Sequence, residues 1–163
     1  STHIRRLPES VATLYNLQVM LLKEFKNLQK LPPKMGNLIN LRHLDTTGAL
    51  KLEEMPLQMG ELTQLQTLSN FIVGTGSGSS IRELRNLPNL RGTISISKLE
   101  NVIDPRDATK ANLIEKRGLK ELILEWGGVF DSTSRNDTNV LDLLQPHLRL
   151  EILEIKGYTG TRF

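Results

Sequence analysis

Aliphatic residues recur along this chain at a fixed interval. In its first part, leucine or methionine returns every 24 residues in four separate phases. The phases are Leu7, Leu31 and Met55; Leu14, Leu38 and Leu62; Leu17, Leu41 and Leu65; and Met20, Leu44 and Leu68. Pro8, Pro32 and Pro56 keep the same register. The chain is therefore built from a repeated unit with polar positions between its aliphatic residues.

A period in the twenties with leucines at fixed offsets is typical of leucine-rich repeats. The fold class that we expect is α/β: a right-handed solenoid with parallel strands on the concave face and short helices or turns on the convex face. Each repeat would bury its leucines only against its neighbours. Such a stack presents one long surface, so the pattern favours a protein that binds other molecules.

Within each repeat, the segment Leu-x-x-Leu-x-Leu predicts a short strand whose leucines point inward. The strands are expected at residues 17–22, 41–46, 65–70, 94–96, 119–126 and 150–155. Their central inward residues are Met20, Leu44, Leu68, Ile94, Leu122 and Leu153, which are spaced by 24, 24, 26, 28 and 31 residues. The repeats thus lengthen toward the C-terminus, where we expect the convex segments to become helical.

Two helices are expected in these longer repeats. Asp104 has the position of an N-cap, and Ala108, Ala111 and Ile114 fall on one face of the helix that would follow. Residues 131–145 predict a mobile polar loop as far as residue 139, followed by a second short helix.

The sequence divides into three parts. Residues 1–73 hold the regular 24-residue repeats, residues 74–80 form a Gly/Ser loop, and residues 81–163 hold longer, irregular repeats. We expect one continuous solenoid. The loop lacks the Lys-Ser/Thr pair of a phosphate-binding loop, so we interpret it as a flexible linker. Neither end has a polar capping repeat, which predicts a fragment of a larger chain.

Composition narrows the class of protein. The 21 basic and 18 acidic residues nearly balance, and no Lys/Arg run is long enough to predict nucleic-acid binding. No apolar stretch is long enough to span a membrane. The absence of cysteine favours a reducing compartment, hence the cytoplasm. One glycosylation sequon at Asn136 argues weakly the other way.

Catalytic chemistry has little support in the sequence. There is no cysteine nucleophile, and His3, His43 and His147 would lie far apart in a stack of repeats. Catalytic triads need their members in mutual contact. We therefore expect no enzyme, no metal site and no cofactor site in this chain.

One segment carries a specific resemblance. The run from Leu90 to Val102, Leu-Arg-Gly-Thr-Ile-Ser-Ile-Ser-Lys-Leu-Glu-Asn-Val, resembles a motif of plant intracellular nucleotide-binding leucine-rich-repeat disease-resistance proteins of the coiled-coil class. The later motifs around Ala111, Trp126 and Gly157 are similar to that family as well. So is the stretch from residue 31 to residue 45.

The resemblance implies a ligand-recognition and autoregulatory repeat domain of a plant immune receptor that acts in defence against pathogens. In that family the repeats follow an ADP/ATP-binding domain, which this chain does not include. The implied partners are that nucleotide-binding domain in the full-length chain and a pathogen effector or a modified host protein. The alternative is an intracellular scaffold that regulates a signalling protein such as a small GTPase, although such scaffolds have steadier repeats with a regular asparagine.

The residues that alternate with the inward leucines should face the concave side. We expect the protein-binding positions to be Val19, Leu21, Lys23, His43, Asp45, Thr47, Thr67, Ser69, Phe71, Thr93, Ser95, Ser97, Glu121, Ile123, Glu125, Ile152, Glu154 and Lys156. Phe71 and Ile123 are the strongest candidates, because apolar residues on a polar face can anchor a partner. A register shift of one residue would bury them instead. Trp126 could also anchor a partner, but its place after a strand favours the edge of the core.

Overall fold

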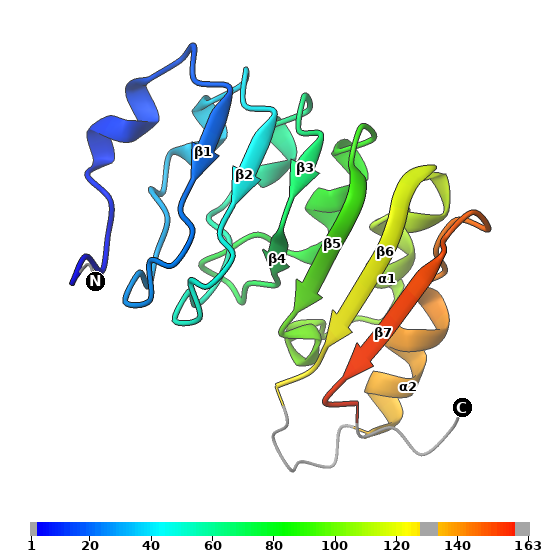
Figure 1. Ribbon diagram of the computed structural model, residues 1–163. Helices are drawn as coiled ribbons and strands as arrows, with labels where there is room; N and C mark the ends of the chain where they lie inside the picture. Colours follow the sequence, from blue (N-terminus) through cyan, green and yellow to red (C-terminus); the bar gives the residue numbers. More distant parts are fainter. Residues whose placement is uncertain (1–2, 128–133, 159–163) are drawn as a thin grey trace.

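A computed structural model describes residues 3–127 and 134–158 of the 163-residue chain. Its strands lie side by side in a row, and its short helices lie behind them (Figure 1). All strand pairs are parallel. The expected α/β class, with parallel strands on one side and short helices on the other, is confirmed.

The elements alternate along the chain as the repeat pattern requires. The strands are β1 (Val19–Leu21), β2 (His43–Asp45), β3 (Thr67–Leu68), β4 (Asn70–Ile72), β5 (Arg91–Ser97), β6 (Gly118–Glu125) and β7 (Ile152–Lys156). The α-helices are α1 (Arg106–Lys110) and α2 (Ser134–Leu143). The 3₁₀ helices are η1 (Glu9–Thr13), η2 (Met35–Asn37), η3 (Met59–Glu61), η4 (Ile81–Asn86), η5 (Leu99–Asn101) and η6 (Leu113–Glu115).

The strands form two sheets rather than one, in the orders β1-β2-β3 and β4-β5-β6-β7. Both sheets meet at Ser69, whose N–H donates to the Leu44 carbonyl (3.2 Å) while its carbonyl accepts from the Ser95 N–H (3.1 Å). One strand was expected at residues 65–70, so that prediction is wrong in detail. The third repeat pairs with β2 of the preceding repeat through β3, and with β5 of the following repeat through β4.

The core is the stack of aliphatic phases. Leu38, Leu44, Leu62 and Leu68 are buried together with their counterparts in the later repeats. Leu14 and Leu153 were also expected inside, but both are half exposed. Each lies at one end of the described stack, where a neighbouring repeat packs on one side alone.

The Gly/Ser loop is packed against the third repeat and is not a free linker. Ser79 is buried, and its hydroxyl donates to the Pro56 carbonyl and accepts from the Met59 N–H. A Cβ on Gly78 would lie 2.7 Å from the Met55 carbonyl oxygen, so this position has room only for glycine.

The convex side differs from the prediction in two places. Ala108 and Ala111 are buried as expected, but Ile114 is exposed because α1 ends early and Leu113 of η6 takes the inward position. The second helix, α2, already begins at Ser134, within the stretch expected to be a loop.

Individual asparagines link neighbouring repeats although a regular asparagine position is missing. Their side-chain amides donate to backbone carbonyls of the preceding repeat: Asn40 to Tyr15 (2.8 Å), Asn101 to Val73 (2.9 Å) and Asn136 to Val102 (2.9 Å). The amide of the sequon residue Asn136 is therefore engaged in holding α2 against the preceding repeat.

Candidate binding face

The candidate functional site is the surface that the strands turn away from the helices, which we call the strand face. Burial alternates along β1, β2 and β6, so that Met20, Leu44 and Leu122 point inward while their neighbours reach solvent. The expected positions that are exposed or half exposed are Val19, Leu21, Lys23, His43, Asp45, Thr47, Thr67, Ser69, Thr93, Ser95, Ser97, Glu121, Ile123, Glu125, Ile152, Glu154 and Lys156. Their accessibility agrees with the expected alternation except on β7, where Leu153 is about as exposed as Ile152. Their role in binding stays a prediction.

Phe71 is the exception, because it is 0% exposed. The prediction that it faces a partner is wrong. The change of sheet at Ser69 shifts the alternation by one residue, so that Phe71 pairs with the inward Ile96. Asn70, which the sequence analysis did not single out, takes the half-exposed position next to Ser95. The increase of the repeat spacing from 24 to 26 residues between Leu68 and Ile94 marks this repeat as irregular, but an even increase does not predict a shift by one residue.

Polar side chains on the first three repeats form two separate sets of contacts. Lys23 lies 3.5 Å from the Asp45 carboxylate, which also accepts from the Thr47 N–H (2.9 Å). Burial raises the pKa of Asp45, but the hydrogen bonds from Thr47 and the charge of Lys23 outweigh it, and the pKa is lowered from 3.8. His43 Nδ1 lies 2.8 Å from Thr67 Oγ1. These contacts fix the side chains of the strand face before any partner arrives.

Ser69 closes the junction between the two sheets. Its carbonyl is turned to β5, so the Thr46 N–H donates to the Ser69 hydroxyl instead (2.8 Å). The hydroxyl also lies 3.2 Å from Thr46 Oγ1. The buried end of β2 is thereby satisfied without a neighbouring strand.

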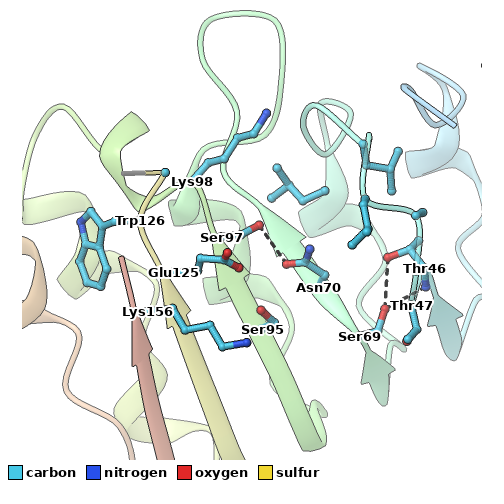
Figure 2. A pocket seen from close by; sticks show the side chains of 16 residues that line it. Thr46, Thr47, Ser69, Asn70, Ser95, Ser97, Lys98, Glu125, Trp126 and Lys156 are labelled. Atoms are coloured by element: carbon cyan, nitrogen blue, oxygen red, sulfur yellow. Dashed lines mark hydrogen bonds between the residues drawn. The ribbon is translucent and has the colours of Figure 1, made fainter. Parts of the chain in front are cut away.

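Beside this junction the strand face has a hollow of about 510 Å³ (Figure 2). Thr47 and Leu50 line it on the side of the first sheet, and Asn70, Ser95 and Lys156 line it on the side of the second. The side-chain Oδ1 of Asn70 accepts from the Ser97 hydroxyl (3.1 Å), which leaves the side-chain NH₂ group of Asn70 as a donor for a ligand. The hollow therefore combines hydroxyl, amide, charged and aliphatic groups.

Trp126 bounds the hollow at the end of β6. It is buried and packs edge-to-face on Tyr158, with ring centroids 5.2 Å apart. It therefore lies at the edge of the core, the position that its sequence context favoured. Its indole Nε1 is buried and has no hydrogen-bond partner in the described part of the chain.

Two structural searches bear on other kinds of site. Across residues 3–127 and 134–158, no three His, Cys, Asp or Glu side chains gather closely enough to hold a metal ion. Neither α1 nor α2, the α-helices within those ranges, is long and apolar enough to cross a membrane. The strand face presents a mixture of aliphatic, hydroxyl and charged groups.

Comparison with known proteins gives a consistent set of similarities. A family model of R13L1/DRL21 leucine-rich repeats matches residues 81–163. A putative disease resistance protein of Arabidopsis thaliana is 52% identical over 171 residues, which covers 100% of this chain and 12% of the relative. The putative disease resistance protein RGA1 of Solanum bulbocastanum is 45% identical over 98 residues, covering 60% of this chain and 10% of the relative. The chain thus spans about a tenth of the length of these curated relatives.

Proposed function

The chain belongs to the R13L1/DRL21 leucine-rich-repeat family, and from that premise we propose that it is the recognition and autoregulatory repeat region of a plant disease resistance protein. The resemblance that was recognised in residues 90–102 is confirmed by the family match and by the relatives. Those relatives carry the name of disease resistance proteins, which supports a role in defence. Nothing in the comparisons favours the small-GTPase scaffold.

Three further features belong to this proposal. The coil of repeats is right-handed, because connections between neighbouring parallel strands almost always have that hand. The protein works in the cytoplasm, which its lack of cysteine supports. It acts by binding and not by catalysis, since the strand face exposes a broad contact surface.

The strand face would serve two partners in turn. In the resting receptor it binds the ADP/ATP-binding domain of the same protein and holds that domain inactive. A pathogen effector or a modified host protein then binds this region more tightly in the released state than in the restrained state. Such a difference in affinity is what shifts the balance between the two states.

One observation carries the proposal: aliphatic side chains are exposed at both ends of the strand face, with mostly polar residues between them. Val19 and Leu21 lie on β1, and Ile152 lies on β7. Leu21 is 60% exposed, so a partner that covers it gains about 1–2 kcal/mol from this side chain alone. Each such contact is smaller than that of a typical hot-spot residue, so several of them, on both sides of the hollow, act together in this proposal.

The test uses a chimera in which this chain replaces the matching segment of the Arabidopsis relative. We expect the double substitution Leu21→Lys and Ile152→Lys to weaken co-purification with the nucleotide-binding domain, expressed as a separate piece, by about tenfold or more. The same substitution should cause defence signalling without a pathogen. Ile39→Lys is the matched control, because Ile39 is similarly exposed but lies in the turn before β2.

Circular dichroism and the thermal midpoint of each variant establish that the fold is intact. If the double variant folds and still binds as the unsubstituted chimera does, the strand face is not the restraining surface. If Ile39→Lys releases signalling equally, the effect is not specific to the strand face.

A further inference from the structure

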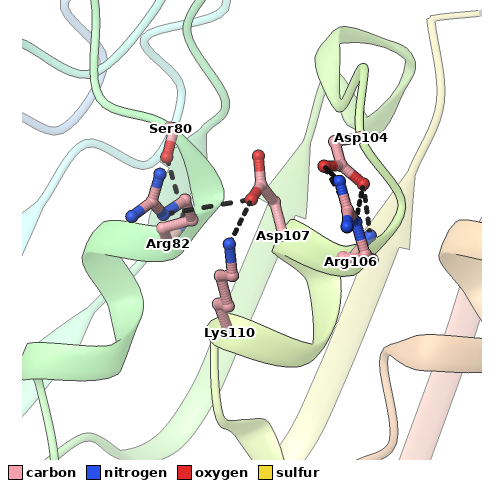
Figure 3. Close-up of polar contacts among 6 residues, drawn as sticks. All are labelled: Ser80, Arg82, Asp104, Arg106, Asp107 and Lys110. Carbon is pink, nitrogen blue, oxygen red and sulfur yellow. Dashed lines mark hydrogen bonds and ion pairs between the residues drawn. The ribbon is translucent and has the colours of Figure 1, made fainter.

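A second candidate surface lies on the helix side of the molecule, away from the strand face. There η4 and α1 pack beside each other, and the Gly/Ser loop leads into η4 (Figure 3). Two neighbouring hollows of about 270 and 430 Å³ occupy this region, and Ser80 lines both. We call the pair of hollows the η4–α1 groove.

The smaller hollow is mainly apolar, and Asn101 and Asp107 also line it. The buried side chains of Val73, Ile81 and Val102 line it. Ile103 also lines it and is 89% exposed. Gly76 stands at the same hollow with open space where a side chain would be. An apolar side chain of a partner could therefore contact both the buried residues and Ile103 here.

The larger hollow is basic. Arg82, Arg85 and Lys110 line it, and Arg85 forms no ion pair within the described residues. Asp107 lies between the other two cations, but at 3.9 Å from Arg82 Nε and 3.6 Å from Lys110 Nζ. These are long contacts between partly exposed groups, which contribute little and are easily replaced.

A second carboxylate, Glu83, also lines this hollow. Glu83 accepts from the Gly60 N–H at 3.0 Å and thereby links η4 to η3. Three cations therefore face two carboxylates, Asp107 and Glu83, which leaves the region of the larger hollow with one positive charge in excess. An additional anionic group would find an arginine without an ion pair and a lysine held by one long contact.

We propose that the η4–α1 groove binds an acidic peptide segment of a partner protein, with a carboxylate between Arg85 and Lys110 and a neighbouring apolar side chain against Ile103. Charge complementarity selects the acidic residue, and the apolar hollow selects the side chain next to it. Because the cations lie at the larger hollow and the apolar residues at the smaller one, the peptide would bind in one orientation only. Because the groove and the strand face lie on different sides, the two surfaces can be occupied together.

The experiment probes the chain with a synthetic array of random ten-residue peptides. We expect the bound peptides to be enriched in Asp or Glu within a few positions of Leu, Ile or Phe. The tightest peptide of that kind is then labelled with fluorescein, and its affinity is measured by anisotropy over a range of NaCl concentrations. Affinity should fall as salt rises, because the contacts are between exposed charges.

Two variants and two matched controls locate the binding. Arg85→Glu combined with Lys110→Glu should weaken the labelled peptide by about tenfold or more, and Ile103→Ser should weaken it by several-fold. The controls make the same changes at exposed positions away from the groove: Arg117→Glu combined with Lys120→Glu, and Leu148→Ser. The controls should bind as the unsubstituted chain does.

Several outcomes would overturn the proposal. These are an array without the acidic–apolar preference, a labelled peptide that binds the charge-reversed variant unchanged, and equal losses in the controls. Selective binding of basic peptides would overturn it as well. Failure of the strand-face substitutions described above would leave this result untouched, since none of them lies in the groove.

Discussion

Lys116 offers the sharpest test of how the repeats are packed, because it is a lysine in a leucine phase. Leu38, Leu62 and Leu87 each end a 3₁₀ helix and donate their N–H to the carbonyl three residues before, and Lys116 does the same after η6. Its side chain is 1% exposed, and its Nζ donates to the Leu87 carbonyl (3.1 Å). We predict that Lys116→Met stabilises the fold.

The magnitude follows from the pKa of the amine. Burial lowers the pKa of Lys116 from 10.5 to about 8. The folded state therefore disfavours the charged amine, at a cost of up to about 3 kcal/mol below pH 8, where the amine is protonated in both states. Methionine removes that cost but leaves the Leu87 carbonyl without its donor, which costs about 1 kcal/mol. The expected net gain at pH 7 is about 2 kcal/mol.

The lowered pKa of Lys116 also determines how the free energy of unfolding changes with pH. Between pH 8 and 10.5 the unfolded state binds more protons than the folded state, so the stability of the unsubstituted chain should rise with pH. In Lys116→Met this rise should disappear, and the two stability curves should converge by about pH 10. Lys120→Met, at an exposed position of β6, should keep the rise.

Urea unfolding between pH 7 and 10, followed by the fluorescence of Trp126, measures these free energies directly. Trp126 is the only tryptophan and is buried next to the same repeat. The reasoning is refuted if Lys116→Met is less stable than the unsubstituted chain at pH 7. It is equally refuted if the stability of the unsubstituted chain stays flat from pH 8 to 10.

Two further predictions concern packing. Gly78→Ala should destabilise the chain by about 1–3 kcal/mol in urea unfolding, because a Cβ at Gly78 meets the Met55 carbonyl. Gly76→Ala should change the stability by less than about 0.5 kcal/mol, because nothing lies near that position. Equal effects of the two substitutions would show that the loop is not packed. Phe71→Ala should cost about 3–5 kcal/mol, and Leu21→Ala on the strand face less than about 0.5 kcal/mol. A neutral Phe71→Ala would place that residue on the surface after all.

The regular repeats could be predicted from the sequence because burial there follows directly from periodicity. Leu44 and Leu68 point inward for the same reason, 24 residues apart, and their neighbours on the strand face follow by alternation. The prediction failed at Phe71, where the chain changes sheets and pairs with β5 at an offset of 25 residues instead of 24. Alternation holds only within one ladder, and the position of the change depends on the hydrogen bonds of Ser69.

Local composition is also misleading at two places where tertiary contacts decide the structure. The glycines and serines of residues 74–80 are typical of a flexible linker, but Ser79 is buried and hydrogen-bonded to the third repeat. The polar start of α2 is typical of a loop, but Val140 of the helix and Leu144 directly after it are buried, and Asn136 is hydrogen-bonded to the preceding repeat. Neither contact can be predicted from the local secondary-structure propensity of these residues.

The central claim is that the strand face is the surface that binds the nucleotide-binding domain in the resting receptor. Its most direct test is photo-crosslinking in the chimera with the Arabidopsis relative, with a benzophenone amino acid placed at Ser95 on the strand face or at Ile39 in the turn before β2. We expect Ser95 to give an intramolecular crosslink to the nucleotide-binding domain and Ile39 to give none. A crosslink to that domain from Ile39 but not from Ser95 would contradict the claim.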